Sequence, residues 1–208
     1  MVTIALIAVN VLVFLFELSL GRAVDTFTLY WGLVPAAFSW VTVFTSMFLH
    51  GGLLHVAGNM LYLWIFGDNV EDRMGHGRFL VFYLLCGVAA ALAQTITAPD
   101  SVVPMVGASG AIAGVMGAYF VLYPKSRIVT LIPLFFFFQV IEVPAIVFLG
   151  IWFVMQFISG LGSIVTVTGQ SAGGVAVWAH VAGFVAGISG VVVFRRRERQ
   201  RVEWWHDL

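Results

Sequence analysis

Long apolar runs separated by short polar turns dominate the chain. A membrane-spanning helix needs roughly 20 apolar residues, and runs of about this length recur with few charges inside them. We expect six spans, at about residues 2–20, 52–66, 79–98, 109–123, 141–160 and 177–194. The pattern therefore predicts an all-α fold, a polytopic bundle of six transmembrane helices in a single membrane domain over residues 1–194.

Two stretches do not fit a simple span. Residues 21–49 mix charges with many aromatic side chains, which favour the membrane–water boundary, so we expect a long first loop lying partly in the interface. Residues 128–161 are too long and too interrupted for one span, and we expect an interfacial segment over 128–138 before the fifth span. The interrupting residues are Pro133, Gln139, Glu142 and Pro144.

The fourth run, residues 109–123, is short for a membrane span. A short helix is acceptable if its start lies below the membrane surface and a loop dips in to reach it. Non-helical backbone at that depth needs protein or water around it, because lipid cannot satisfy its polar groups. We therefore expect the loop over residues 99–106 to be surrounded by protein or water rather than by lipid.

The composition supports a membrane protein. Hydrophobic residues make up 61% of the chain and charged residues 10%, with a mean hydropathy of +1.03, whereas soluble domains carry roughly 25% charged residues. The formal net charge is zero, so the chain has no excess of basic residues that would indicate nucleic acid as a partner. The one cysteine, Cys86, lies in an apolar run and is expected to be a packed thiol. The first run begins at Met1 without a basic segment before it, which favours a retained span over a signal peptide.

Basic residues near the spans predict the orientation of the chain. With six spans, the turns at 67–78 and 124–127 and the tail at 195–208 share one side. That side carries nine basic residues and the other side only Arg22. The positive-inside rule then places both termini in the cytoplasm of a cell (plasma or inner) membrane. The nine are Arg73, Arg78, Lys125, Arg127, Arg195, Arg196, Arg197, Arg199 and Arg201.

The segment Gly107-Ala-Ser-Gly110 is typical of a turn that leads into a tightly packed helix. Ser109 is expected in the first helical turn, where backbone N–H groups have no helical partner. A hydroxyl there can attack a carbonyl carbon while the N–H groups hold the oxygen that becomes negative. On this segment alone, a small-residue packing motif with an inert serine is the simpler interpretation.

Polar side chains inside the second and sixth spans lie in the same outward-facing half of the membrane as Ser109. His180 lies near the outer start of the sixth span, and His55 and Asn59 lie in the outer half of the second. Such residues are costly in lipid and are functional candidates by default. An imidazole can take the proton of a serine hydroxyl, and two side-chain donors on one helix face can stabilise an oxyanion. The alternative is that His180 bonds to a backbone carbonyl and that His55 and Asn59 only join helices.

Small residues on the fourth and sixth spans favour close contact between these helices. Ala179, Gly183 and Gly187 form one row, and Gly110, Gly114 and Ala118 form the other. Backbone-to-backbone packing of this kind is common in membranes and would bring His180 within reach of Ser109.

Three histidines, His50, His55 and His180, also raise the possibility of zinc. No carboxylate or cysteine joins them at metal-site spacing, and the sequence has no His-Glu-x-x-His motif. We therefore expect no metal and no cofactor, and for His50 a structural hydrogen bond where the first loop meets the second span.

Taken together, these motifs resemble the rhomboid family of intramembrane serine proteases. They are His50-x4-His55-x3-Asn59, Gly107-Ala-Ser-Gly110, Ala179-His180-x2-Gly183-x3-Gly187 and the acidic–arginine turn Val70-Glu-Asp-Arg-Met-Gly75. The resemblance implies that Ser109 is the nucleophile and His180 the general base, with His55, Asn59 and the Ser109 N–H as the oxyanion hole and His50 supporting the loops. The substrate would be the transmembrane helix of another protein, cut near its outer end after a small residue.

The sequence departs from the family pattern at two positions. Ala113 stands where some relatives have a tyrosine that stacks on the histidine, and Gly32 follows Trp31 where some have arginine. No Asp or Glu is placed to orient His180, so we expect a dyad rather than a triad. The Gly-rich loop at 162–174 and the aromatic side chains of the fifth span form the expected gate, and these are Phe148, Trp152, Phe153 and Phe157.

Two other functions remain possible at this point. One is a catalytically silent rhomboid-like protein that binds membrane helices, which the intact Ser109 and His180 disfavour. The other is a small-molecule transporter, which the clustering of polar groups in one half of the membrane disfavours. The sequence names neither the substrate nor the oligomeric state.

Overall fold

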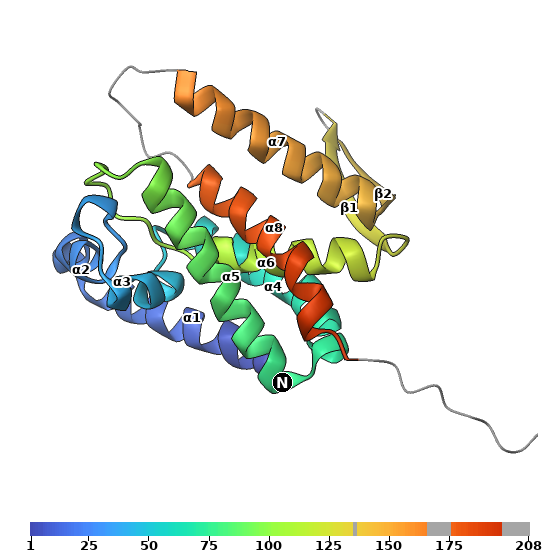
Figure 1. The fold of residues 1–208 in the computed structure, drawn as a ribbon, viewed down its shortest axis with the longest axis horizontal. Helices are drawn as coiled ribbons and strands as arrows, with labels where there is room; N and C mark the ends of the chain where they lie inside the picture. Colours follow the sequence, from blue (N-terminus) through green and yellow to red (C-terminus); the bar gives the residue numbers. More distant parts are fainter. Residues whose placement is uncertain (135–136, 166–175, 197–208) are drawn as a thin grey trace, which may run out of the picture.

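The computed structural model describes residues 1–134, 137–165 and 176–196, and it is mostly helical (Figure 1). Short helices and 3-10 turns follow the first long helix, and one antiparallel hairpin interrupts the second half of the chain. The long helices are α1 (Val2–Ser19), α4 (Leu53–Met74), α5 (His76–Thr97), α6 (Ser109–Leu122), α7 (Ala145–Val165) and α8 (Val177–Phe194). The short ones are η1 (Gly21–Ala23), α2 (Val24–Trp31), η2 (Pro35–Ala37), α3 (Trp40–Thr45) and η3 (Ser46–Phe48).

Within the described residues, four helices are long and apolar enough to cross a membrane, namely α1, α5, α7 and α8. A fifth crossing is available if the stretch Trp40–Phe48 and α4 count as one span, although the two are bent by 89°. The helix α6 is apolar but shorter. The sequence predicted that the second span ends at residue 66 and is followed by a charged turn over residues 67–78. Most of these residues are helical instead, since α4 continues to Met74 and α5 begins at His76.

The short helix α6 lies in the interior of the bundle (Figure 1). It packs most extensively against α8 and also against α5 and α4. Every residue from Gly110 to Tyr119 is buried. Protein rather than lipid therefore surrounds most of α6, which explains how a helix this short is accommodated.

Glycines allow α6 and α8 to approach backbone to backbone. A Cβ on Gly183 would overlap the carbonyl of Gly110, and one on Gly187 would overlap the carbonyl of Gly114. A Cβ on Gly114 would in turn meet the Cys86 side chain of α5. The close approach of these three helices therefore depends on residues without side chains.

The hairpin differs from the interfacial segment and early fifth span that the sequence predicted. Strand β1 (Arg127–Leu134) pairs with β2 (Phe137–Pro144), with Ile128 opposite Val143. Residues from 141 to 144 therefore belong to a strand, and α7 begins only at Ala145. Ile128 is buried while Val129 is exposed, the alternation typical of a strand that packs one face.

The expected first loop is a chain of short helices that packs against the segment leading to Ser109. Leu33 and Met105 exchange two backbone hydrogen bonds, of 2.8 and 3.0 Å. The N–H of Gly107 donates to the carbonyl of Ser46 at 2.9 Å. These bonds satisfy backbone groups that lipid could not, and they place the segment before α6 against η3 and Leu33.

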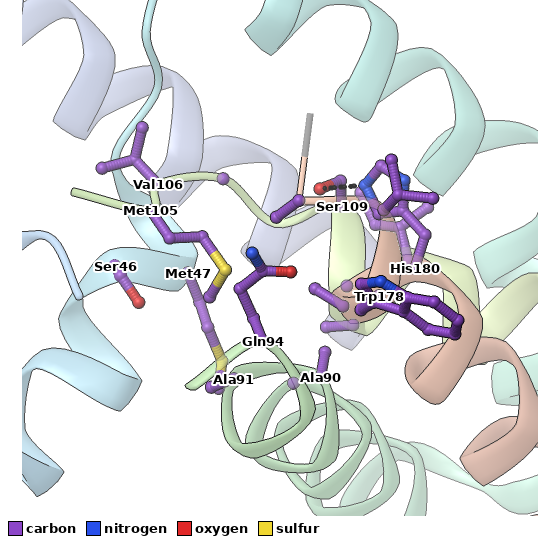
Figure 2. A pocket seen from close by; sticks show the side chains of 18 of the residues that line it. Ser46, Met47, Ala90, Ala91, Gln94, Met105, Val106, Ser109, Trp178 and His180 are labelled. Atoms are coloured by element: carbon purple, nitrogen blue, oxygen red, sulfur yellow. Dashed lines mark hydrogen bonds between the residues drawn. The ribbon is translucent and has the colours of Figure 1, made fainter. Parts of the chain in front are cut away.

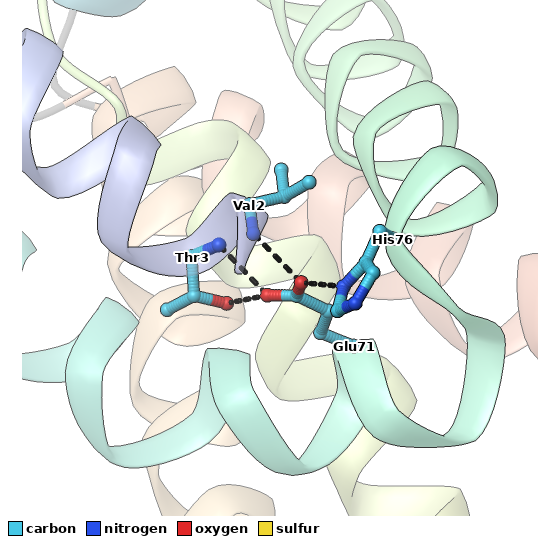
Figure 3. Close-up of polar contacts among 4 residues, drawn as sticks. All are labelled: Val2, Thr3, Glu71 and His76. Atoms are coloured by element: carbon cyan, nitrogen blue, oxygen red, sulfur yellow. Dashed lines mark hydrogen bonds and ion pairs between the residues drawn. The ribbon is translucent and has the colours of Figure 1, made fainter.

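A buried carboxylate ties the start of α1 to the junction of α4 and α5 (Figure 3). Glu71 accepts hydrogen bonds from the N–H groups of Val2 and Thr3, each at 2.7 Å, and from the Thr3 hydroxyl at 2.6 Å. The ring of His76 also contacts the carboxylate. A negative charge at a helix N-terminus is favourable, so this contact fixes α1 against the rest of the bundle.

Candidate active site

Ser109 and His180 meet although 71 residues separate them in the chain. The Ser109 Oγ lies 2.8 Å from His180 Nε2 (Figure 2). Ser109 is the first residue of α6 and His180 lies in the first turn of α8, so both stand at the same end of two closely packed helices. His180 is 8% exposed. A hydroxyl and an imidazole in this geometry can exchange a proton.

His55 and Asn59 lie in the first turns of α4 and line the same cavity as Ser109 and His180. The Gly51 N–H donates to His55 Nδ1 at 3.4 Å, so the ring proton of a neutral His55 resides on Nε2. Among the described residues, Asn59 Nδ2 has no hydrogen-bond partner. Within residues 1–134, 137–165 and 176–196, no hydrogen bond uses either the Asn59 Nδ2 donor or the His55 Nε2–H.

Gly107 brings the backbone before Ser109 close to these two donors. A Cβ on Gly107 would lie 2.8 Å from His55 Nε2 and 3.6 Å from Asn59 Nδ2. Gly107 has φ +126, a conformation that L side chains rarely adopt. Both the space and the backbone angle therefore favour glycine at this position.

One cavity of about 1210 Å³ contains these groups. In Figure 2, Ser109 and His180 lie on one side of the view, and Met47 and Met105 lie on the other. The lining combines backbone of the segment before α6 with side chains from α4, α5 and α8. A cavity of this size can admit water and an extended peptide segment together. The polar side chains that line it include Ser46, His55, Asn59, Gln94, Ser109 and His180.

His50 makes a structural hydrogen bond through its backbone and packs through its ring. Its backbone N–H donates to the Glu17 carboxylate of α1, with N–O distances of 3.1 and 3.3 Å. Its ring packs edge-on against His55, with 5.2 Å between centroids. Neither ring nitrogen of His50 has a partner in the part of the chain that the structure describes. His50 is therefore held by its backbone and braces the His55 ring.

Two contacts of His180 were not foreseen from the sequence. The Gln156 Oε1 lies 3.0 Å from His180 Nδ1. The Trp152 ring lies 5.9 Å from the His180 ring, centroid to centroid, with 38° between the planes. Both side chains come from α7, and Trp152 had been noted only as part of the gate. A signal was present, because Gln156 is a lone amide inside the apolar run of α7.

The aromatic side chains expected at the gate pack between α7 and α8. Phe153 stacks on Phe184 with ring centroids 4.9 Å apart, and Phe157 meets the edge of Trp178 at 6.1 Å. Most of the loop that was expected to complete the gate, from residue 166 onward, lies outside the described residues, as does the basic tail from residue 197.

Comparison with known proteins gives a consistent family match. The model of the rhomboid domain matches residues 37–197. A rhomboid protease of Bacillus subtilis named GluP is 43% identical over 79 residues, which cover 38% of this chain and 15% of that protein. A putative rhomboid protease of the same organism, YdcA, is 36% identical over 95 residues, covering 46% of this chain and 47% of that protein.

A longer alignment reaches a more distant relative. The mouse presenilin-associated rhomboid-like protein, which is mitochondrial, is 28% identical over 176 residues, covering 78% of this chain and 41% of that protein. The chain thus spans less than half the length of each of these relatives.

Proposed function

This chain belongs to the rhomboid family of multi-pass membrane proteins, and we propose that it is an intramembrane serine endopeptidase with a Ser109–His180 dyad. The observation that carries the proposal is the 2.8 Å contact between Ser109 Oγ and His180 Nε2 inside a cavity that also contains His55 and Asn59. The proposed substrate is a transmembrane helix of another protein, hydrolysed in or near its outer end.

The reaction follows from the positions of the reacting atoms. Ser109 Oγ attacks the carbonyl carbon while His180 Nε2 takes the hydroxyl proton. The C–N bond then breaks, and Nε2–H gives its proton to the leaving amine. Water, deprotonated by the same Nε2, attacks the acyl-enzyme and releases the new carboxylate and the free serine. The chemistry needs no metal or cofactor.

Three donors are available for the negative oxygen that forms during both steps. They are the Nε2–H of His55, the amide of Asn59 and the N–H of Ser109 at the start of α6. The unused donor on Asn59 and the tautomer of His55 that Gly51 favours support this role. Fixed donors at a developing charge are among the largest contributions to catalysis.

The distribution of basic residues supports a specific topology. We assign six spans, with both termini in the cytoplasm of a cell (plasma or inner) membrane. Arg73 and Arg78 flank the α4–α5 junction, and Arg195 and Arg196 follow α8, at the end of the bundle away from Ser109. The active site then opens to the extracytoplasmic side, and α7, whose aromatic side chains pack against α8, forms part of the gate.

The test is cleavage of a model transmembrane substrate by the purified protein in liposomes, with the product mass locating the cut. Ser109→Ala and His180→Ala should each abolish cleavage, whereas Ser189→Ala, an exposed serine on α8, should not. A fluorophosphonate probe should label Ser109 and should label it much less when His180 is replaced.

Two outcomes would contradict the proposal. Native cleavage by Ser109→Ala, or probe labelling at another serine, would move the nucleophile elsewhere. A folded wild-type protein that binds the substrate helix but neither cleaves it nor reacts with the probe would instead identify a catalytically silent member of the family.

A further inference from the structure

The dyad histidine has a hydrogen-bond partner on the nitrogen that faces away from Ser109. Gln156 Oε1 lies 3.0 Å from His180 Nδ1, and Ser109 Oγ lies 2.8 Å from His180 Nε2. The imidazole therefore has a polar neighbour on each side. The two neighbours come from different helices, α7 and α6, while His180 itself is on α8.

The two contacts together select one neutral tautomer. If Ser109 donates its hydroxyl proton to Nε2, that nitrogen carries the lone pair and Nδ1 carries the ring proton. The Nδ1–H then needs an acceptor, and the amide oxygen of Gln156 supplies one. The opposite tautomer would place a proton on Nε2, facing Ser109, and could not act as a base.

A second residue of α7 holds the plane of the imidazole. Trp152 lies four residues before Gln156, on the same helix face. Its ring lies 5.9 Å from those of both His180 and Phe184. Ala113, which is fully buried on α6, has no ring that could do this. The helix α7 thus provides both a flat apolar neighbour and a polar partner to the same imidazole.

We propose that Gln156 is the positioning residue of the dyad, accepting the Nδ1–H of His180 and so holding Nε2 unprotonated and directed at Ser109. This inference rests on the proposed protease function. During the reaction Nε2 gains the serine proton and Nδ1–H stays bonded to Gln156, so no proton passes to the amide. The amide only orients and polarises the ring.

A neutral amide suits this position in a membrane protein. A carboxylate in the same place would have to be desolvated as a charge, which is far more costly than burying a hydrogen-bonded amide. Orientation of the histidine is nevertheless valuable, because a wrong tautomer costs about 10⁴-fold in turnover in soluble serine proteases. Gln156 provides orientation without a buried charge.

The test compares three variants of α7 in the same liposome assay. Gln156→Met keeps the length of the side chain and removes the acceptor. Its kcat should fall by about tenfold or more with little change in KM, since loss of the second partner of a functional histidine costs about 10–100-fold in metal sites. Met155→Leu, an exposed neighbour on α7, should behave as the wild type.

The third variant, Gln156→Glu, keeps an acceptor and adds a charge. It should retain activity at neutral and alkaline pH, and the acid limb of its kcat/KM profile should move to higher pH because the carboxylate stabilises the imidazolium. A side chain at position 156 that does not face Nδ1 would not move this limb, so the shift reports the contact itself. His55, the other titratable side chain near His180, is unchanged in all variants, so the comparison isolates residue 156.

Each result decides the inference. Wild-type kcat and pH profile in Gln156→Met would overturn it. If Gln156→Met fails to fold, as judged by its unfolding temperature, an unmoved acid limb in Gln156→Glu would overturn it instead. Failure of the proposed function is a separate result, in which the wild type itself neither cleaves nor reacts with the fluorophosphonate probe.

Discussion

At the scale of single residues, the candidate site is a set of polar groups of which some are hydrogen-bonded to each other and some have no partner among the described residues. Ser109 and His180 are hydrogen-bonded to each other, and His55 Nδ1 accepts a hydrogen bond from the Gly51 N–H. Among the described residues that line the cavity, the buried polar atoms without a partner are Asn59 Nδ2, Gln94 Oε1 and Trp178 Nε1. Buried polar groups are normally paired within a protein, so the unpaired Asn59 donor agrees with the proposed oxyanion role.

The oxyanion donors can be tested one at a time. Losing one such donor costs roughly 10²–10³-fold in turnover in soluble serine proteases, and here two side chains share the load. We therefore expect His55→Ala and Asn59→Ala each to lose about tenfold or more in kcat, with a smaller change in KM.

Asn69→Ala is the matched control, because this exposed asparagine lies on the same helix, away from the cavity. Native turnover in both single variants and in the double variant would show that His55 and Asn59 only join helices.

At the scale of elements, the site depends on how closely α6 and α8 approach. Gly114 and Gly187 lie deeper in the bundle than Ser109 and His180 and touch no reacting atom. Helix axes pack roughly 8–10 Å apart depending on the side chains between them. Because α8 meets α6 with glycine against backbone carbonyl, any side chain at this contact acts as a spacer.

We expect Gly187→Ala to lower activity and Gly187→Leu and Gly114→Leu to be nearly inactive. Misplacement of reacting groups by about 1 Å can cost on the order of 10²-fold in rate. Even alanine at position 187 should lower activity, because its Cβ would overlap the Gly114 carbonyl. A backbone carbonyl cannot move away as a flexible side chain can. Cleavage assays and fluorophosphonate labelling measure the loss.

Gly77→Ala on α5 is the control, because a Cβ there would meet nothing within 4 Å. Full turnover in both leucine variants would mean that the Ser109–His180 contact does not depend on this packing.

At the scale of the whole molecule, the ends of the helices away from the site are held by a few buried polar contacts. Glu71, which is 1% exposed, joins the start of α1 to the end of α4 through three hydrogen bonds and contacts His76 at the start of α5. Because α1 also positions Glu17 to accept a hydrogen bond from the His50 N–H, the position of α1 affects the active site as well.

Glu71→Gln should therefore destabilise the whole bundle. Its amide keeps one acceptor oxygen and would direct its NH2 group at the donors of either Val2 or Thr3, which bond to different carboxylate oxygens. Hydrogen bonds to a charged group contribute about 1.5–3 kcal/mol each. We expect a loss of about 2 kcal/mol or more in the free energy of unfolding, seen as a lower unfolding temperature in detergent. Asp72→Asn, an exposed neighbour, should change little. Equal unfolding temperatures for the two variants would show that Glu71 does not hold α1.

The class of molecule and the family could be read from the sequence. Apolar runs reflect transfer from water, which depends on local composition, so the bounds of α1, α5, α6 and α8 were predicted to within a few residues. The charged end of α4 and the start of α7 were not, because α4 continues through its polar residues to Met74 and strand β2 takes the residues before Ala145.

The resemblance to rhomboids is confirmed by the match over residues 37–197. The candidate residues Ser109, His180, His55 and Asn59 stood out because polar groups in apolar runs are costly. The structure brings them to one cavity, and their roles remain predictions.

Which polar groups become partners became known from the tertiary structure alone. The contact between Gln156 and His180 joins residues 24 positions apart, and the bond from the His50 N–H to Glu17 joins residues 33 positions apart. Both depend on how the helices are rotated and spaced. The hairpin before α7 was also missed, because its residues are apolar in either conformation and strand pairing is set by a partner elsewhere. The pattern along the chain shows which residues avoid water and which polar residues are costly in lipid. The partner that a residue meets depends on how closely neighbouring helices approach, and here glycines on α6 and α8 permit a close approach.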